Sequence, residues 1–190
     1  MPKLAAAPNF GAAADFGPPP ATISSRFLAR AEAAELGTLG ALDNRKIEID
    51  RFEQVLAVLQ REFPDIRVEV QREHPHLEAA ADIPVQRGVS IPVSINLQNA
   101  DELHLNIGEH FWVEWFPCGQ EEVFERYCAA LRGWLSGRYQ VVESYVGGKA
   151  VAARLQEPVA GGWENVASWG SVGGCLPLPR RKRFIKNMGT

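Results

Sequence analysis

The chain has 190 residues, of which 46% are hydrophobic and 23% are charged, and this usage is typical of a globular protein. Its net charge of −3 excludes a general electrostatic attraction to nucleic acid or anionic membranes, and its three cysteines exclude a fully paired disulfide framework. No apolar run reaches the roughly 18 residues of a membrane span, so we expect no membrane association and a cytoplasmic location.

The N-terminal segment is expected to form a flexible arm. Residues 1–22 are rich in Ala, Pro and Gly and contain few large apolar side chains. Such a composition favours polyproline or disordered conformations. A short helix is predicted to follow, capped by Ser24 or Ser25 and continuing to Glu35.

The first strong helical pattern begins at Asp50 and ends before Pro64. Its apolar residues recur at helical spacing and share one face, namely Phe52, Val55, Leu56, Leu59 and Phe63. Residues 66–71 then alternate between apolar and polar side chains, which predicts a half-buried strand. The proline-containing segment 73–87 is predicted to be a loop.

Three strands in meander order are predicted over residues 89–115. Alternating apolar residues mark them: Val89, Ile91, Val93, Ile95 and Leu97, then Leu103 and Leu105, then Phe111, Val113 and Trp115. The turn at 99–101 places Leu97 beside Leu103. A three-residue turn at 107–109 places Leu105 opposite Phe111 and keeps the apolar residues of both strands on one side of the sheet.

Another helix is predicted after Pro117, with Gly137 at its C-terminal cap. Its apolar face consists of Phe124, Tyr127, Cys128, Leu131 and Leu135. Trp134 lies off this stripe and is expected to be partly exposed. The dipeptide Gly147-Gly148 then predicts a two-residue hairpin turn between strands at 139–146 and 149–156.

This order of elements defines an α+β fold. A two-layer arrangement satisfies it: the three-strand meander and the C-terminal hairpin form an antiparallel sheet, and the helices pack on one face. The core domain is expected to span 23–160, after the arm at 1–22. Residues 161–190 contain Trp163, Trp169 and a basic cluster, and they are predicted to form an irregular tail packed on the core.

The predicted register gathers polar side chains on the sheet face opposite the helices. They are two histidines, two glutamates, an amide and a tryptophan: His104, His110, Glu102, Glu114, Asn96 and Trp112. Neighbouring side chains on adjacent strands lie about 4.5–5.5 Å apart at Cβ, so these groups can interact. Three interpretations stay open: the solvated side of a sheet, a binding surface anchored by Trp112, and a catalytic or metal site.

No sequence motif supports a nucleotide-binding, hydrolase or metal site, so we predict no catalytic residues, no metal and no cofactor. Cys118 is the one thiol with a prospect of reactivity, because it precedes a helix N-terminus whose dipole favours the thiolate. Cys128 lies on the apolar face of that helix and is expected to pack in the core.

Tryptophans and basic residues mark two further surfaces. Trp163 and Trp169, like Trp112, are candidate anchors for a partner. The basic run at the C-terminus offers candidate contacts to nucleic-acid phosphates, namely Arg180, Arg181, Lys182 and Arg183. The acidic remainder of the chain argues against nucleic acid as the main partner.

The preferred hypothesis is a small cytoplasmic protein-binding module that acts through a protein partner; an inhibitor or immunity-type protein is one concrete form. An enzyme or small-ligand binder that uses the polar face around His104 and His110 is the alternative. A third hypothesis is a nucleic-acid accessory protein that uses the basic tail. The sequence carries no signal for the oligomeric state.

Overall fold

The computed structural model describes residues 38–71, 76–171 and 179–188. Residues 39–190 form one compact unit. The predicted arm at 1–22 and the predicted helix from Ser24 to Glu35 lie outside the described residues. Within the described part, no helix combines the length and the apolarity that crossing a bilayer requires.

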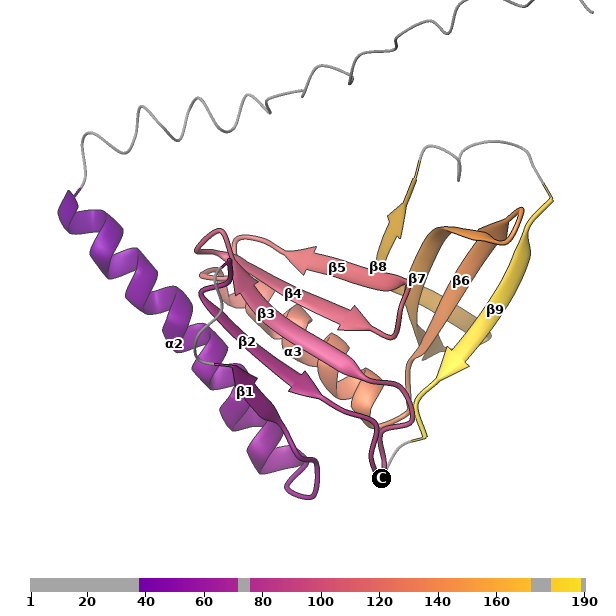
Figure 1. Cartoon of the computed structure of the whole chain (residues 1–190), viewed down its shortest axis with the longest axis horizontal. Coiled ribbons are helices and arrows are strands. Elements are labelled where there is room, and N and C mark those ends of the chain that lie inside the picture. The colour runs from indigo at the N-terminus through magenta and orange to yellow at the C-terminus, as the bar shows by residue number, and fades with distance from the viewer. Residues whose placement is uncertain (1–37, 72–75, 172–178, 189–190) are drawn as a thin grey trace, which may run out of the picture. The chain divides into compact units, whose positions relative to one another are not determined.

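The described residues form two helices and two antiparallel sheets. In chain order the elements are α2 (Thr38–Glu62), β1 (Glu69–Gln71), β2 (Ala79–Ile83), β3 (Val93–Gln98), β4 (Glu102–Ile107), β5 (Phe111–Trp115), α3 (Glu121–Leu135), β6 (Gln140–Val146), β7 (Lys149–Val159), β8 (Gly162–Gly170) and β9 (Arg181–Lys186). One sheet has five strands in the order β1-β2-β3-β4-β5, and the other has four in the order β8-β7-β6-β9 (Figure 1).

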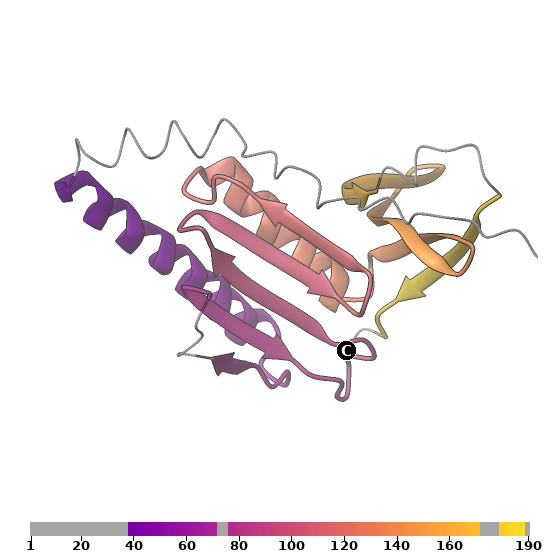
Figure 2. The ribbon, with the colours of Figure 1, turned by 45° about the horizontal axis from the view of Figure 1, so that its top comes forward.

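The predicted α+β class with antiparallel strands is confirmed. The meander is the centre and one edge of the five-stranded sheet, whose strands lie side by side in chain order in Figure 2. The predicted hairpin is also present, with Gly147 and Gly148 in the left-handed region at φ 56° and 82°. The hairpin strands do not join the meander, however, and form a second sheet with β8 and β9.

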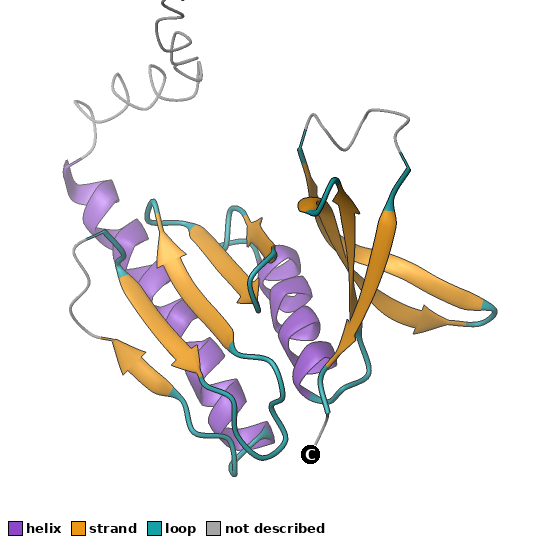
Figure 3. Cartoon of the chain, turned by 45° about the vertical axis from the view of Figure 1, so that its right-hand side comes forward, coloured by secondary structure: helices purple, strands orange, loops and turns teal. Residues whose placement is uncertain are grey.

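Both helices lie behind the five-stranded sheet in Figures 1 and 3. Burial follows the predicted helical stripes, and the buried apolar residues of the helices include Phe52, Val55, Leu59, Phe124, Tyr127, Cys128, Leu131 and Leu135. They belong to one cluster with the apolar residues of the sheet, which include Ile95, Leu97, Leu103, Leu105 and Trp115. Alternation along the strands leaves the polar side chains of β3, β4 and β5 on the other face.

The predicted register is right between β3 and β4 and is displaced by two residues between β4 and β5. Leu97 pairs with Leu103, as expected. The second turn consists of residues 108–110, with Gly108 at φ 61°, so Ile107 pairs with Phe111 and Leu105 with Val113. This register adds a buried Ile107–Phe111 pair, which the predicted one lacks. A shift of two residues preserves the faces, because side chains alternate with a period of two.

Several predicted boundaries are wrong. Helix α2 begins at Thr38, so it includes Gly40 and starts a full three turns before Asp50. Strand β1 covers only Glu69–Gln71 of the predicted segment 66–71, and its three residues are exposed, contrary to the predicted half-burial. The predicted loop at 73–87 contains β2, whose sequence Ala-Ala-Ala-Asp-Ile lacks the large alternating side chains that mark strands.

The segment 161–190 is the largest departure from the predicted structure, because it contains two strands in place of an irregular tail. Strand β8 pairs with β7, and β9 pairs with β6, both antiparallel. Trp134 is fully buried, contrary to the predicted partial exposure. It shares the core cluster with Val141 and Leu155 of the four-stranded sheet, so the second sheet supplies apolar surface that a single-sheet prediction leaves out.

Asn187 connects the end of β9 to the body of the protein. Its buried amide donates from Nδ2 to the carbonyl oxygens of Gly88 and Leu135, each at 2.9 Å. Its Oδ1 accepts from the backbone N–H of Ser90 at 2.9 Å. Hydrogen bonds to buried backbone groups contribute about 0.5–1.5 kcal/mol each, so this side chain holds the strand in a defined position.

We expect Gly133→Ala to destabilise the protein. A Cβ at this position lies 2.5 Å from the ring of buried Tyr139, and such overpacking costs about 1–3 kcal/mol. Gly119→Ala is the control, because nothing lies within 4 Å of its Cβ and its free energy of unfolding is expected to stay within about 0.5 kcal/mol. Urea denaturation measures both; equal midpoints for the two variants contradict the packing described for Gly133.

Candidate functional site

The polar face of the five-stranded sheet carries the predicted candidate residues, in rows set by the strand register. One row reads Ala80, Asn96, His104 and Glu114 across β2 to β5. The next reads Asp82, Ser94, Asn106 and Trp112. The displacement of β5 therefore brings Glu114, and not Trp112, opposite His104.

Glu102, His104 and Glu114 form a compact cluster, which we call the acidic triad. One side-chain ligand atom from each lies within 4.8 Å of the others. Nε2 of His104 lies 3.5 Å from Oε2 of Glu102, which also accepts a hydrogen bond from Nδ2 of Asn99 at 2.7 Å. His104 is buried and Glu114 is exposed, so the triad extends from the sheet surface to solvent.

Asn96 lies beside the triad and is buried, but its amide oxygen is occupied. Oδ1 of Asn96 accepts a hydrogen bond from Nε2 of Gln98 at 2.8 Å. The triad and these two amides therefore form a polar layer on the sheet, as expected for side chains that share one face.

His110 belongs to a second cluster, which consists of His110, Trp112, Tyr145 and Trp169 and which we call the aromatic junction. The rings of His110 and Tyr145 meet edge to face at 5.7 Å, and Trp112 stacks on Trp169 at 6.2 Å. Nε1 of Trp169 donates to the backbone oxygen of His110 at 2.6 Å. The junction thus joins β5 to the four-stranded sheet, and His110 and His104 belong to different clusters.

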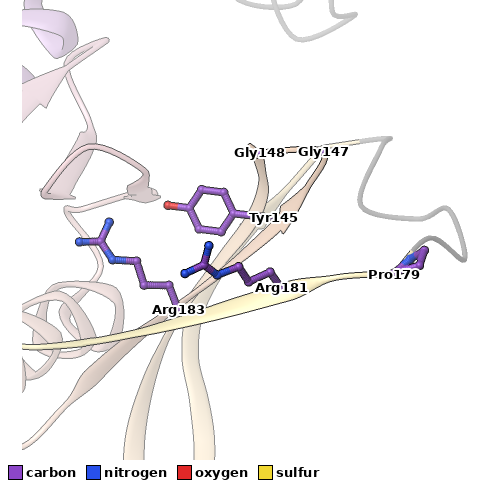
Figure 4. Close-up of a pocket in the computed structure, with 6 residues that line it drawn as sticks. All are labelled: Tyr145, Gly147, Gly148, Pro179, Arg181 and Arg183. Atoms are coloured by element: carbon purple, nitrogen blue, oxygen red, sulfur yellow. The ribbon is translucent and has the colours of Figure 1, made fainter.

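A pocket of about 510 Å³ adjoins the aromatic junction at Tyr145. Its lining residues are Tyr145, Gly147, Gly148, Pro179, Arg181 and Arg183 (Figure 4). Tyr145 and Arg181 are paired residues on β6 and β9, and Arg183 is two positions further along β9. Alternation along a strand places both arginines on the same face of the sheet. We call this feature the cationic pocket.

Glu143 lies beneath the cationic pocket as a fully buried carboxylate. Its Oε2 accepts a hydrogen bond from the Tyr145 hydroxyl at 2.5 Å and lies 3.8 Å from Nη1 of Arg183. Burial, followed by the hydrogen bond to Glu143, raises the pKa of Tyr145. Tyr145 therefore stays protonated at neutral pH and continues to donate its hydrogen bond to Glu143. Among the described residues, no carboxylate forms an ion pair with Arg181, so the pocket retains positive charge.

The predicted basic tail does not form one patch. Arg181 and Arg183 face the pocket, whereas Lys182 and Lys186 lie on the opposite face of β9, and Arg180 precedes the strand. Nζ of Lys186 sits over the ring of Trp163 at 4.7 Å. Trp163 is therefore apart from the aromatic junction, while Trp169 is part of it.

The structure does not support a reactive thiol at Cys118. Helix α3 begins at Glu121, and Cys118 is fully buried ahead of it. Burial, with the nearby carboxylates of Glu48 and Asp101, raises its pKa to about 11. Cys128 is buried in the core as predicted, and burial raises its pKa to about 11 as well.

The sequence contains two signals for the cationic pocket. The two arginines, Arg181 and Arg183, are one signal, although residues 181–186 lack the alternation of apolar and polar side chains that marks a strand. Tyr145 next to Gly147-Gly148 marks the end of a hairpin strand. Only the pairing of β6 with β9, which are distant in sequence, brings the two signals together.

The fold and its surfaces define an α+β protein with two antiparallel sheets, a polar sheet face that carries the acidic triad, and a cationic pocket beside an aromatic junction. Compared with protein-family models, curated proteins and solved structures, the chain matches none.

We expect iodoacetamide at pH 8 to leave Cys118 and Cys128 unmodified in the folded protein. A thiol with a pKa of about 11 is ionised in about one molecule in a thousand at this pH, and both thiols are buried. Both cysteines should react after unfolding in guanidinium chloride. Mass spectrometry of the alkylated peptides checks this; rapid modification of Cys118 in the folded chain contradicts the raised pKa.

Proposed function

We propose that this protein is a protein-binding module that holds an acidic segment of a partner protein in the cationic pocket. An inhibitor or immunity-type protein is one form that such a module takes. The aromatic junction beside the pocket is the apolar part of the same recognition surface. The observation that carries the proposal is the cationic pocket, whose charged lining side chains are both arginines.

The chemistry of the pocket fits a carboxylate. Arginine presents a planar set of donors that matches the two oxygens of a carboxylate, and such charge-assisted pairs are stronger than neutral hydrogen bonds. Arg181 and Arg183 project into the pocket beside Tyr145 in Figure 4. A pocket of about 510 Å³ has room for one or two acidic side chains of an extended segment.

The aromatic junction supports a protein as the source of that segment. Trp112 is 50% exposed although it stacks on Trp169. Tryptophans of this kind are enriched among the residues that dominate protein–protein affinity. Tyr145 belongs to both the junction and the pocket, so an acidic group in the pocket and an apolar group on Trp112 can belong to one partner segment.

The two other hypotheses receive less support. The basic residues are divided between the two faces of β9. They therefore do not form the continuous basic surface that follows a phosphate backbone. His104 and His110 lie in different clusters, so an active site built on both histidines has no support from the geometry.

We expect Arg181→Ala to weaken the binding of an acidic peptide. In a fluorescence anisotropy titration at about 0.15 M salt with dye-labelled hexaglutamate, loss of one charge-assisted contact should raise Kd by about tenfold or more. Lys182→Ala is the matched control, because it removes the same charge from the opposite face of the same strand. Its Kd should change by less than about twofold.

Two results overturn the proposal. Equal effects of Arg181→Ala and Lys182→Ala indicate attraction by overall charge without a site. Tighter binding of a dye-labelled single-stranded oligonucleotide than of hexaglutamate, with the same loss on Arg181→Ala, makes the pocket a phosphate site and the protein a nucleic-acid binder.

The contribution of Trp112 is tested with a second acidic peptide that carries one phenylalanine. We expect the wild-type protein to bind it more tightly than hexaglutamate, and Trp112→Ala to abolish that difference. Trp112→Phe keeps an aromatic ring on Trp169 and should retain most of the difference in affinity between the two peptides. Because Trp112 is half exposed, Trp112→Ala should lower the free energy of unfolding by only about 1 kcal/mol. A peptide preference that survives Trp112→Ala excludes the junction from the binding surface.

A further inference from the structure

We propose that the acidic triad of Glu102, His104 and Glu114 binds a divalent transition-metal cation, with Zn²⁺ as the probe. The three residues come from the two adjacent strands β4 and β5, and His104 and Glu114 are directly paired. Glu102 and His104 are alternate residues of β4 and share its polar face. Neither the cationic pocket nor the aromatic junction contributes a residue to the triad.

The imidazole of His104 provides the observation that distinguishes the triad from an ordinary acidic surface. His104 is only 9% exposed, and its Nε2 is inaccessible to solvent with no hydrogen-bond partner among the described residues. The closest carboxylate oxygen, Oε2 of Glu102, is 3.5 Å away. A buried nitrogen without a hydrogen-bond partner destabilises the fold, and binding a metal ion satisfies it.

The charge of the triad also favours a cation. Two carboxylates flank one imidazole, and in the described part of the chain neither Glu102 nor Glu114 forms an ion pair with Lys or Arg. Side chains held this close repel one another unless a positive charge lies between them.

The spacing of the ligand atoms is close to that of a bound metal ion. Metal–nitrogen and metal–oxygen bonds in zinc sites are about 2.0–2.2 Å, so two ligands of one ion are at most about 4.4 Å apart. Atoms that already lie within 4.8 Å of one another reach this geometry through small side-chain rotations. An imidazole with two carboxylates suits Zn²⁺, Mn²⁺, Fe²⁺ or Co²⁺ better than Mg²⁺ or Ca²⁺, which prefer oxygen alone.

The surroundings of the triad suit a metal site as well. Nδ2 of Asn99 donates to Oε2 of Glu102 at 2.7 Å and so restrains the orientation of this carboxylate, as partners of metal ligands commonly do. Glu114 is exposed, which gives an ion a path from solvent to His104. Three protein ligands leave at least one coordination position for water.

Calorimetric titration of the full chain, stripped of metal with a chelator, tests the site with Zn²⁺ at neutral pH. We expect one equivalent of Zn²⁺ to bind to the wild-type protein with micromolar or tighter affinity. Both His104→Ala and Glu114→Gln should weaken that binding by about 100-fold or abolish it. Glu114→Gln removes an exposed charge and no volume, so it remains informative if His104→Ala fails to fold.

His110→Ala is the matched control, because it removes a histidine of the aromatic junction and leaves the triad intact; its Zn²⁺ affinity should equal that of the wild type. Arg181→Ala should also bind Zn²⁺ normally, so failure of the pocket proposal and failure of this one are distinguishable. The proposal is overturned if the wild-type protein binds no Zn²⁺, or if His104→Ala and Glu114→Gln bind it as tightly as the wild type does. Loss of Zn²⁺ binding in His110→Ala alone also overturns it.

Discussion

The buried amide of Asn187 is the interaction on which the arrangement of the surface features depends. It donates hydrogen bonds to the carbonyl oxygens of Gly88 and Leu135 and accepts one from the backbone N–H of Ser90. All three residues are distant from Asn187 in sequence. Strand β9 has little apolar side-chain burial of its own, because five of its six residues are exposed. Pairing with β6 and the Asn187 contacts therefore hold it, and they decide where Arg181 and Arg183 lie.

The position of β9 also makes a buried carboxylate tolerable. An ionised carboxylate in the core is costly unless it is paired and hydrogen-bonded. Glu143 receives a hydrogen bond from Tyr145 and lies close to the guanidinium of Arg183. The same two side chains line the cationic pocket, so the groups that neutralise Glu143 are also those that a ligand meets. An anionic ligand bound as proposed would have to compete with Glu143 for Arg183, whereas Arg181 has no such competitor among the described residues.

How much of this follows from the sequence depends on the range of the interactions involved. Alternation alone predicts that His104, Trp112 and Glu114 share a face, because the face on which a residue lies depends only on its odd or even position along its own strand. It does not predict that Glu114 and not Trp112 lies opposite His104, since that depends on whether the turn is 107–109 or 108–110. The β6–β9 pairing and the burial of Trp134 depend on contacts within or with a second sheet, and no local sequence pattern predicts these contacts.

Strand β5 carries a residue of the aromatic junction and a residue of the acidic triad. Trp112 belongs to the aromatic junction and Glu114 to the acidic triad, and they are alternate residues on the same face of one strand. Alternate residues of a strand are about 6.6–6.8 Å apart, a distance that one or two side chains of a bound segment span. A divalent cation on the triad would change the local charge beside Trp112 from negative to near neutral. An acidic segment bound as proposed in the cationic pocket and extending along β5 would be repelled by the bare carboxylates of Glu102 and Glu114, and the cation would remove that repulsion. The net charge of −3 conceals this separation, because it averages a cationic pocket on β6 and β9 and an acidic triad on β4 and β5.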